Sequence, residues 1–275
     1  MKLSNRTAER LAAGIKRFQP VIANAKARDV NESDTSIIVT DVLADCFGYD
    51  KYSEITSEFA IRGTYVDLAI KLENKPRLLI EVKQIGSELK EQHTKQAVDY
   101  AANQGIEWVL LTNAIDWRVY RVQFAQPIGQ DLVLEFDFTT LEPRKSEHLE
   151  LIGLLTKEGL TKSGLDDYHE QRQAMSRYFL GAMLLSDTVL DVVRRELRRV
   201  SPGVKITTEE IRGVLEQEVI KRDVIEGDKA EGAKKKVGRS QNRPLRTKKD
   251  DAEDATTAEI SSTAATASAT PPPAA

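Results

Sequence analysis

The spacing of apolar residues changes at Glu54, and this change restricts the chain to folds that combine helices with a sheet. Before Glu54, apolar residues recur every three or four positions, which is the spacing of one helix face. From Glu54 onward they alternate with polar residues, as in strands whose side chains point to opposite faces of a sheet. The sequence therefore predicts helices first and a sheet after them.

Two helices are predicted ahead of the sheet. The first covers residues 4–28 and is expected to break near Pro20, because proline removes a backbone hydrogen bond. The second is capped by Asn31 or Ser33 and ends at Gly48. Its predicted apolar face consists of Ile37, Ile38, Val42, Leu43 and Cys46.

The sheet is predicted to contain both parallel and antiparallel strands. Three strands are expected at about residues 54–62, 65–72 and 77–83, followed by a helix from about Glu88 to Asn103. Three more strands follow in the segments EWVLLTN, DWRVYRVQF and DLVLEFDF. A helix between strand 77–83 and strand 107–112 makes these two strands parallel neighbours. The predicted fold class is α/β, a mixed sheet flanked by helices.

The remaining chain is predicted to be a helical appendage and a tail. After Pro143 the pattern is mostly helical to about residue 225, with a long amphipathic element containing YFLGAMLL and VLDVVRRELRRV. A shorter helix is expected in ITTEEIRGVLEQEVI, with Thr207, Thr208 and Glu210 as candidate cap residues. We therefore predict a main domain over 1–142, a helical appendage over 143–227 and a disordered low-complexity tail over 228–275.

Composition excludes several classes of site. The 275 residues carry a formal net charge of −3, so any DNA binding must depend on a local basic patch or on metal ions. Cys46 is the single cysteine, which excludes an internal disulfide, and we interpret it as a buried apolar residue. One cysteine and three scattered histidines also disfavour a zinc site. The charged N-terminal residues and the lack of a long apolar run predict a cytoplasmic protein without a membrane segment.

The candidate chemistry lies at the ends of two predicted strands. In the segment LLIEVK, Glu81 and Lys83 share one face at the end of an otherwise apolar strand. Asp67 is a charged residue inside the preceding apolar strand, TYVDLAIKL. A hairpin through residues 73–76 brings it to Glu81. Two carboxylates suit Mg²⁺ or Mn²⁺, and a nearby ammonium can stabilise charge on a phosphate. The alternative is an exposed ion pair between Glu81 and Lys83 on an edge strand.

The helix that follows carries two further candidates. Gln96 and Tyr100 are four residues apart and therefore lie on one helical face, from which they can reach toward the strand ends. Gln96 can donate a hydrogen bond to a phosphate or to a metal-bound water. The alternative is a solvated glutamine and a tyrosine packed between helix and sheet.

These motifs resemble a known nuclease family. The segments SEFAIRGTYVDLAI, RLLIEVKQIGSEL and KQAVDYAANQGIEWVLLTNAIDWRVYRV resemble the N-terminal nuclease domain of the R subunit of type I restriction enzymes, over about residues 30–125. That domain belongs to the PD-(D/E)xK nuclease superfamily. The resemblance implies metal ligation by Asp67 and Glu81, catalysis by Lys83, and support from Gln96 and Tyr100. It also matches Glu32 to an upstream acidic metal position, although the helix dipole alone favours a first-turn glutamate.

Two departures limit what the resemblance implies. Val66 stands where the PD motif has proline, which leaves the aspartate in place. The sequence contains no GxxxxGK[ST] segment, so we expect a free-standing nuclease domain without the ATP-driven motor of the R subunit.

Three other features have two interpretations each. Trp117 can stack on a base or belong to the core, and the core is favoured. The basic run from Lys234 to Lys249 is a DNA tether or a solubilising tail. The apolar helix face within residues 165–200 packs on the main domain or forms a homodimer interface. That face contains Tyr178, Phe179, Met183, Leu184, Val189, Leu190 and Val193.

Two functions are consistent with the sequence. The first is a metal-dependent DNA endonuclease that acts in restriction or defence against foreign DNA. The second is a catalytically silent nucleic-acid-binding or scaffolding protein that retains the nuclease fold. The intact set of Asp67, Glu81 and Lys83 favours the first, because a decayed site is expected to lose one member.

Overall fold

A computed structural model describes residues 3–61, 64–124 and 126–241 of the chain. Its contacts divide the chain into two compact units, with the boundary between Gln171 and Arg172. The first unit contains the sheet, and the second contains only helices among the residues described.

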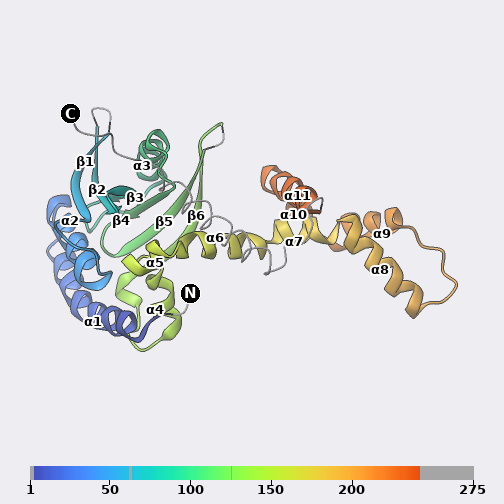
Figure 1. The fold of residues 1–275 in the computed structure, drawn as a ribbon, viewed down its shortest axis with the longest axis horizontal. Helices are drawn as coiled ribbons and strands as arrows, with labels where there is room; N and C mark the ends of the chain where they lie inside the picture. Colours follow the sequence, from blue (N-terminus) through green and yellow to red (C-terminus); the bar gives the residue numbers. More distant parts are fainter. Residues whose placement is uncertain (1–2, 62–63, 125, 242–275) are drawn as a thin grey trace, which may run out of the picture. The chain divides into compact units, whose positions relative to one another are not determined.

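The sheet of the first unit has six strands, which follow one another in sequence order (Figure 1). They are β1 (Ile55–Ile61), β2 (Thr64–Leu72), β3 (Lys75–Val82), β4 (Trp108–Thr112), β5 (Asp116–Gln123) and β6 (Gly129–Asp137). All neighbours are antiparallel except β3 and β4, which are parallel and are connected through α3 (Glu91–Gln104). The predicted mixed sheet and its single parallel pair are therefore confirmed.

Helices cover both faces of this sheet. One face packs on α3 through a cluster that includes Leu79, Ala97 and Leu111. The opposite face packs on helices from both ends of the unit, through a larger cluster that includes Ile15, Val39 and Ile152. Those helices are α1 (Asn5–Ala27), α2 (Glu32–Asp41), α4 (Ser146–Gly153) and α5 (Lys157–Thr161). The fold is a mixed α/β sandwich, as the alternation of periods predicted.

The first helix differs from its prediction at Pro20. α1 continues through this residue to Ala27, so the predicted break is wrong. Pro20 lies on the exposed side, while the opposite side buries seven residues that hold the helix against the core. Gly14 belongs to that buried side, and a Cβ atom there would collide with the Sγ atom of Cys46. Glycine therefore allows α1 to approach the π-helical turn Val42–Cys46 closely.

In the second helix the predicted cap is confirmed, but the predicted apolar face is partly wrong. Asn31 caps α2 by accepting a hydrogen bond from the backbone N–H of Asp34 at 2.9 Å. The segment ends at Gly48, whose φ of 84° is the left-handed conformation that glycine favours. Ile37 was predicted on the apolar face but is 58% exposed, whereas Val39 is fully buried. The π-helical turn changes the rotation of the helix, so a regular 3.6-residue spacing misplaces Ile37.

The first unit extends beyond the predicted boundary at residue 142. Leu154 and Leu155 belong to its core, and Arg10 of α1 forms an ion pair with Glu158 of α5 at 2.7 Å. Residues 143–171 are therefore part of the compact unit that contains the sheet, because their apolar side chains are buried there.

The second unit is a set of short helices. They are α7 (Arg177–Leu184), α8 (Asp187–Val200), α9 (Thr208–Val214), α10 (Arg222–Ile225) and α11 (Asp228–Gln241), preceded by α6 (Gly164–Ala174) at the boundary. The predicted long amphipathic element is divided into α7 and α8, because the backbone leaves the helical conformation at Leu185 and Ser186, where Ser186 is the N-cap of α8. Thr207 and Glu210 form the predicted capping box of α9.

Helix α11 corrects the predicted start of the disordered tail. Residues 228–241 are helical, with Ala230, Ala233 and Val237 buried. These three small apolar residues form a narrow stripe among lysines, which a composition-based interpretation does not detect. The rest of the predicted tail, 242–275, lies outside the described residues. None of the described helices has the length and apolar character that crossing a membrane requires.

Candidate active site

Asp67 lies where strand β2 separates from β3. The pairing of β2 with β3 stops at Leu68 opposite Ile80, and the same register places Asp67 opposite Glu81. On the other side, the ladder with β1 omits the position of Glu58, whose φ is 48°. The irregular backbone on both sides lets the Asp67 carboxylate turn to β3, where its Oδ2 accepts the Val82 N–H at 2.7 Å.

Glu81 and Lys83 lie at the end of β3, on the face covered by α3. Lys83 Nζ donates to Glu81 Oε1 at 2.8 Å, and the Lys83 N–H donates to the carbonyl of Thr112 in β4. The Glu81 side chain is only 5% exposed and that of Lys83 is 17% exposed. The pair is therefore largely buried, and the alternative of an exposed pair on an edge strand does not describe it.

The first turn of α2 adds a third carboxylate. Glu32 Oε2 lies 3.6 Å from Lys83 Nζ, and its side chain is half exposed. The structure thus brings Glu32 of α2 together with Asp67, Glu81 and Lys83 of the β2–β3 hairpin. In the described parts of the chain, no three His, Cys, Asp or Glu side chains are grouped to hold a metal ion. The predicted three-carboxylate ligand set is therefore not preassembled, and Glu32 instead contacts Lys83.

The acidic groups of this site are held in an environment that disfavours their charge. Burial raises the pKa of Asp67, against the lowering effects of the Val82 hydrogen bond and the Lys83 charge. Burial also raises the pKa of Glu81, and the charge of Asp67 adds to this effect. Burial lowers the pKa of Lys83, but the hydrogen bond and charge of Glu81 raise it more, so the net pKa is raised. Lys83 is therefore an ammonium at neutral pH.

The donor set fits a hard divalent cation. The site holds three carboxylates and one ammonium, of which Glu81 and Glu32 pair with Lys83, so the ionised site has an excess of negative charge. Oxygen ligands from one or two carboxylates, completed by water and phosphate oxygens, are typical of Mg²⁺ sites. Asp67 and Glu81 are the residues that would hold such an ion, because they lie opposite each other on adjacent strands and burial raises the pKa of both carboxyls.

Helix α3 presents a polar stripe beside the strand ends. Gln96 Nε2 donates to the Tyr100 hydroxyl at 3.1 Å, so the predicted one-face arrangement is confirmed. Within the described chain, neither residue hydrogen-bonds to Asp67, Glu81 or Lys83. His93, one turn before Gln96, is close enough to Lys83 and Glu32 for their charges to act on its pKa. Sequence analysis did not select His93, although its spacing from Gln96 and Tyr100 marks the same face.

Trp117 belongs to the core and not to the site. Its side chain is fully buried, and its Nε1 donates to the carbonyl of Ala114 at 2.9 Å. Its ring stacks on Phe136 and packs edge-on against Phe47. The prediction that Trp117 binds nucleic acid is therefore wrong, because no face of the indole is available to a base. The alternative interpretation as a core residue is correct.

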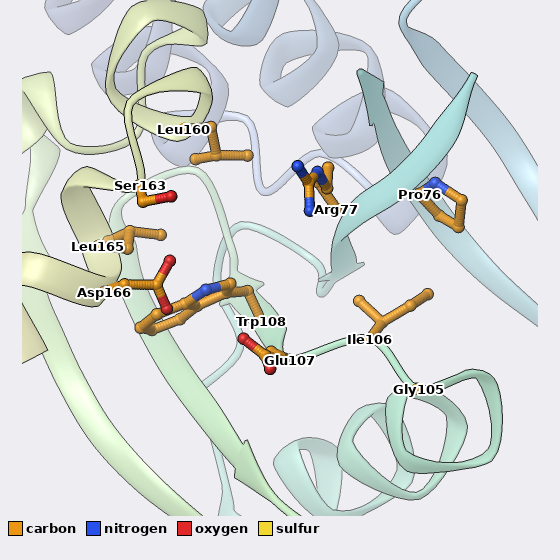
Figure 2. Close-up of a pocket in the computed structure, with 10 residues that line it drawn as sticks. All are labelled: Pro76, Arg77, Gly105, Ile106, Glu107, Trp108, Leu160, Ser163, Leu165 and Asp166. Atoms are coloured by element: carbon orange, nitrogen blue, oxygen red, sulfur yellow. The ribbon is translucent and has the colours of Figure 1, made fainter. Parts of the chain in front are cut away.

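A pocket of about 240 Å³ lies at the other end of the sheet (Figure 2). Its lining includes Arg77 at the start of β3, Trp108 at the start of β4, and the carboxylates of Glu107 and Asp166. Asp166 and Glu107 both pair with Arg121, which also lies over the Trp108 ring. Because β3 and β4 are parallel, this pocket is about 15 Å from the ends that carry Glu81 and Lys83. It takes no part in the candidate active site.

A comparison with known protein families covers most residues of this site. Residues 38–132 match the family model described as Type I restriction enzyme R protein N terminus. The matched segment covers less than half of the chain, but it contains β1 to β5 and α3. It therefore includes Asp67, Glu81, Lys83, Gln96 and Tyr100, whereas Glu32 lies outside it. The sequence-based resemblance to this N-terminal region is confirmed over that segment. No curated protein and no solved structure matches the chain.

Proposed function

We propose that this chain is a Mg²⁺-dependent DNA endonuclease of the PD-(D/E)xK superfamily that acts in restriction of foreign DNA. The observation that carries the proposal is the cluster of the buried Glu81, the half-buried Asp67 and the Lys83 ammonium, where β2 separates from the end of β3. Its position within the segment that matches a restriction R protein supports the same function.

The side chains have distinct roles in this proposal. Asp67 and Glu81 hold Mg²⁺ or Mn²⁺, which when bound polarises a phosphate and makes water a better nucleophile. Lys83 is protonated and donates to the phosphate, where it stabilises the charge that develops during cleavage. Glu32 keeps the ammonium oriented through its contact at 3.6 Å. Gln96 and Tyr100 act as a hydrogen-bonded pair that positions the DNA backbone.

Hydrogen bonds of the sheet hold the side chains of the proposed site in place. Fixed positions for Asp67 and Lys83 result from backbone hydrogen bonds of β3, namely Val82 N–H to Asp67 and Lys83 N–H to Thr112. A site held by a sheet keeps its groups in place without substrate, as hydrolysis of a phosphodiester requires. One site per chain cuts one strand, so a homodimer through residues 165–200 would supply a second cut across the duplex.

A plasmid-nicking assay tests the proposal. Purified protein is incubated with supercoiled plasmid in Mg²⁺, in Mn²⁺ and in EDTA, and conversion to open circles is followed on a gel. We expect nicking in Mg²⁺ or Mn²⁺ and none in EDTA. Glu81→Gln should remove it, whereas Glu107→Gln should not, because Glu107 lies at the opposite end of the sheet. DNA binding without nicking under every metal condition would instead support the catalytically silent function.

A further inference from the structure

Charge is divided unequally between the two units. Residues 1–171 contain 21 Lys and Arg against 27 Asp and Glu, so the unit with the candidate active site is acidic. Residues 172–241 contain 15 Lys and Arg against 11 Asp and Glu, so the helical unit is basic. An acidic catalytic unit repels the phosphates of its proposed substrate, so without metal ions attraction is expected from a basic surface such as one in the second unit.

Helix α8 concentrates this positive charge on one face, which we call the arginine face: Arg194, Arg195, Arg198 and Arg199. Successive residues on a helix are about 100° apart, so positions i, i+1, i+4 and i+5 lie on one side. Val193 lies on the opposite side and is half-buried, and Leu190, one turn before Arg194, is the buried residue of the helix. Arg195, Arg198 and Arg199 are exposed and Arg194 is half-buried, so most of the arginine face is directed to solvent.

The guanidinium groups of the arginine face remain available to a ligand. Arg195 is exposed and has no intramolecular partner among the described residues. Arg198 donates one hydrogen bond, to the Ile206 carbonyl, which leaves its other donors free. Arg194 and Arg199 pair with Asp191 and Glu196 of the same helix. Exposed ion pairs of this kind are worth about 0–1 kcal/mol, so phosphates can replace them at little cost.

Helix stability does not explain this arrangement. Cations in the last turn of a helix interact favourably with its dipole, which accounts for Arg198 and Arg199. The dipole effect falls off within that turn, and Arg194 and Arg195 precede it. Arginine pairs at i and i+4 are about 5–6 Å apart, and each planar guanidinium can bind phosphate oxygens through two N–H groups. The chemistry of the face is therefore that of a phosphate-backbone site.

We propose that the arginine face of α8 binds the phosphate backbone of duplex DNA and so anchors the substrate for the acidic catalytic unit. This inference rests on the proposed function, since that function names DNA as the substrate. A membrane surface is disfavoured, because a helix binds lipid through its apolar face and Leu190 is buried within the unit. Leu197 and Val200 are exposed near the end of the helix, so lipid vesicles are included in the test.

Binding measured without divalent metal separates this inference from cleavage. The full chain is titrated in EDTA against a labelled duplex of about 30 base pairs, by fluorescence anisotropy at several salt concentrations. The test variant is Arg195→Ala/Arg198→Ala/Arg199→Ala. We expect its Kd to rise at least about tenfold and its salt slope to fall by roughly 2 to 3. The control is Lys16→Ala/Lys26→Ala/Lys75→Ala, which removes the same charge from exposed positions of the first unit.

A single substitution shows whether weaker DNA binding could be caused by misfolding of the triple variant. Arg195→Glu removes no intramolecular bond, so its melting temperature should match wild type while DNA binding weakens. The inference is overturned if the triple variant binds within twofold of wild type, or if the control weakens binding equally. It is also overturned if the arginine face is needed only for anionic phosphatidylserine vesicles. A wild-type protein that binds DNA through this face but never nicks plasmid would contradict the proposed function alone.

Discussion

The carboxylates of Asp67 and Glu81 are held where their charged forms are disfavoured. A side chain with only a structural role would gain nothing from this position, because burying a charge opposes folding unless a partner offsets it. Lys83 is the one ammonium in contact with the described carboxylates of this site, and it faces both Glu81 and Glu32. We therefore expect the site to lower the free energy of unfolding of the metal-free protein while allowing it to bind a cation.

We therefore predict that Asp67→Asn stabilises the metal-free protein. The pKa of Asp67 is raised on folding, so the native state binds the proton more tightly than the unfolded state. The free-energy cost of burying the Asp67 carboxylate is absent at low pH, where the carboxyl is protonated in both states. This cost appears as the pH rises above the pKa of the unfolded state and is complete above the pKa of the folded state. At neutral pH we expect a rise in Tm of a few degrees, since about 1 kcal/mol shifts Tm by about 2–4 °C.

Metal should reduce the Tm advantage of Asp67→Asn over wild type. Mn²⁺ should raise the Tm of wild type and have a smaller effect on Asp67→Asn, as a ligand stabilises only the state that binds it. Asp99→Asn, an exposed aspartate of α3, serves as the control and should behave like wild type in both conditions. An equal metal shift in wild type and Asp67→Asn would place the metal at other residues.

Lys83→Ala is predicted to abolish cleavage with DNA affinity nearly the same, and to lower the Tm, because it leaves the buried Glu81 carboxylate without its ammonium partner. The ammonium acts on charge that grows in the transition state, so the rate should fall by about a hundredfold or more. Lys83→Arg should restore little, because a planar guanidinium does not replace a compact ammonium in this confined site. Lys75→Ala, at the exposed start of the same strand, is the control. Wild-type nicking by Lys83→Ala would exclude this residue from catalysis.

At the scale of elements, the pair on α3 should act as one unit. Gln96→Ala and Tyr100→Phe each remove one partner of the 3.1 Å hydrogen bond, and Gln96 is exposed, so stability should hardly change. In a double-mutant cycle of nicking rates, the double variant should lose no more activity than the more damaging single variant. Lys95→Ala provides the control on the same helix. Fully additive losses would mean that the two side chains act separately.

Helix α11 makes a prediction about stability. Val237 is buried beside Ala182 and Ala233, whereas Lys235 of the same helix is exposed. Val237→Asp places a charge in this small core and should unfold the helical unit, seen as a loss of helical circular dichroism. Lys235→Asp changes the charge more but should leave the signal intact. Equal signals from both variants would show that α11 contributes nothing to folding.

Local signals explain which elements could be predicted from sequence. Asn31, Gly105 and Thr207 end or start helices through their own backbone and side-chain geometry, and period-two patterns mark the strands. The ends of β2 and β3 could be predicted as a site, since Asp67, Glu81 and Lys83 are charges in apolar strands. The burial of Trp117 results instead from packing against Phe136, its partner across the β5–β6 pair, and against Phe47, which is far away in sequence. His93 and Glu32 meet Lys83 for the same reason, through tertiary packing.

At the scale of the whole molecule, the division at Gln171 separates the proposed catalytic residues from the proposed DNA-binding face. All candidate catalytic residues lie before it, and the arginine face of α8 lies after it. The first unit has its own core on both faces of the sheet, which is the requirement for independent folding. Residues 172–241 have a much smaller core, formed by Ala182, Ala233 and Val237. The chemistry and the main attraction for DNA are therefore expected to separate when the chain is cut between the units.

A fragment of residues 1–171 is predicted to fold and to nick plasmid in Mg²⁺ or Mn²⁺ at high DNA concentration. Its Kd for duplex DNA should rise at least about tenfold, because an acidic unit without the arginine face lacks most of the electrostatic attraction. Sedimentation checks the dimer as well, since the full chain should be a dimer and the fragment a monomer if residues 165–200 form the interface. A matched fragment with Glu81→Gln is the control for contaminating nuclease. A folded fragment that binds DNA like the full chain would place the DNA-binding surface in the first unit, and a dimeric fragment would move the interface there.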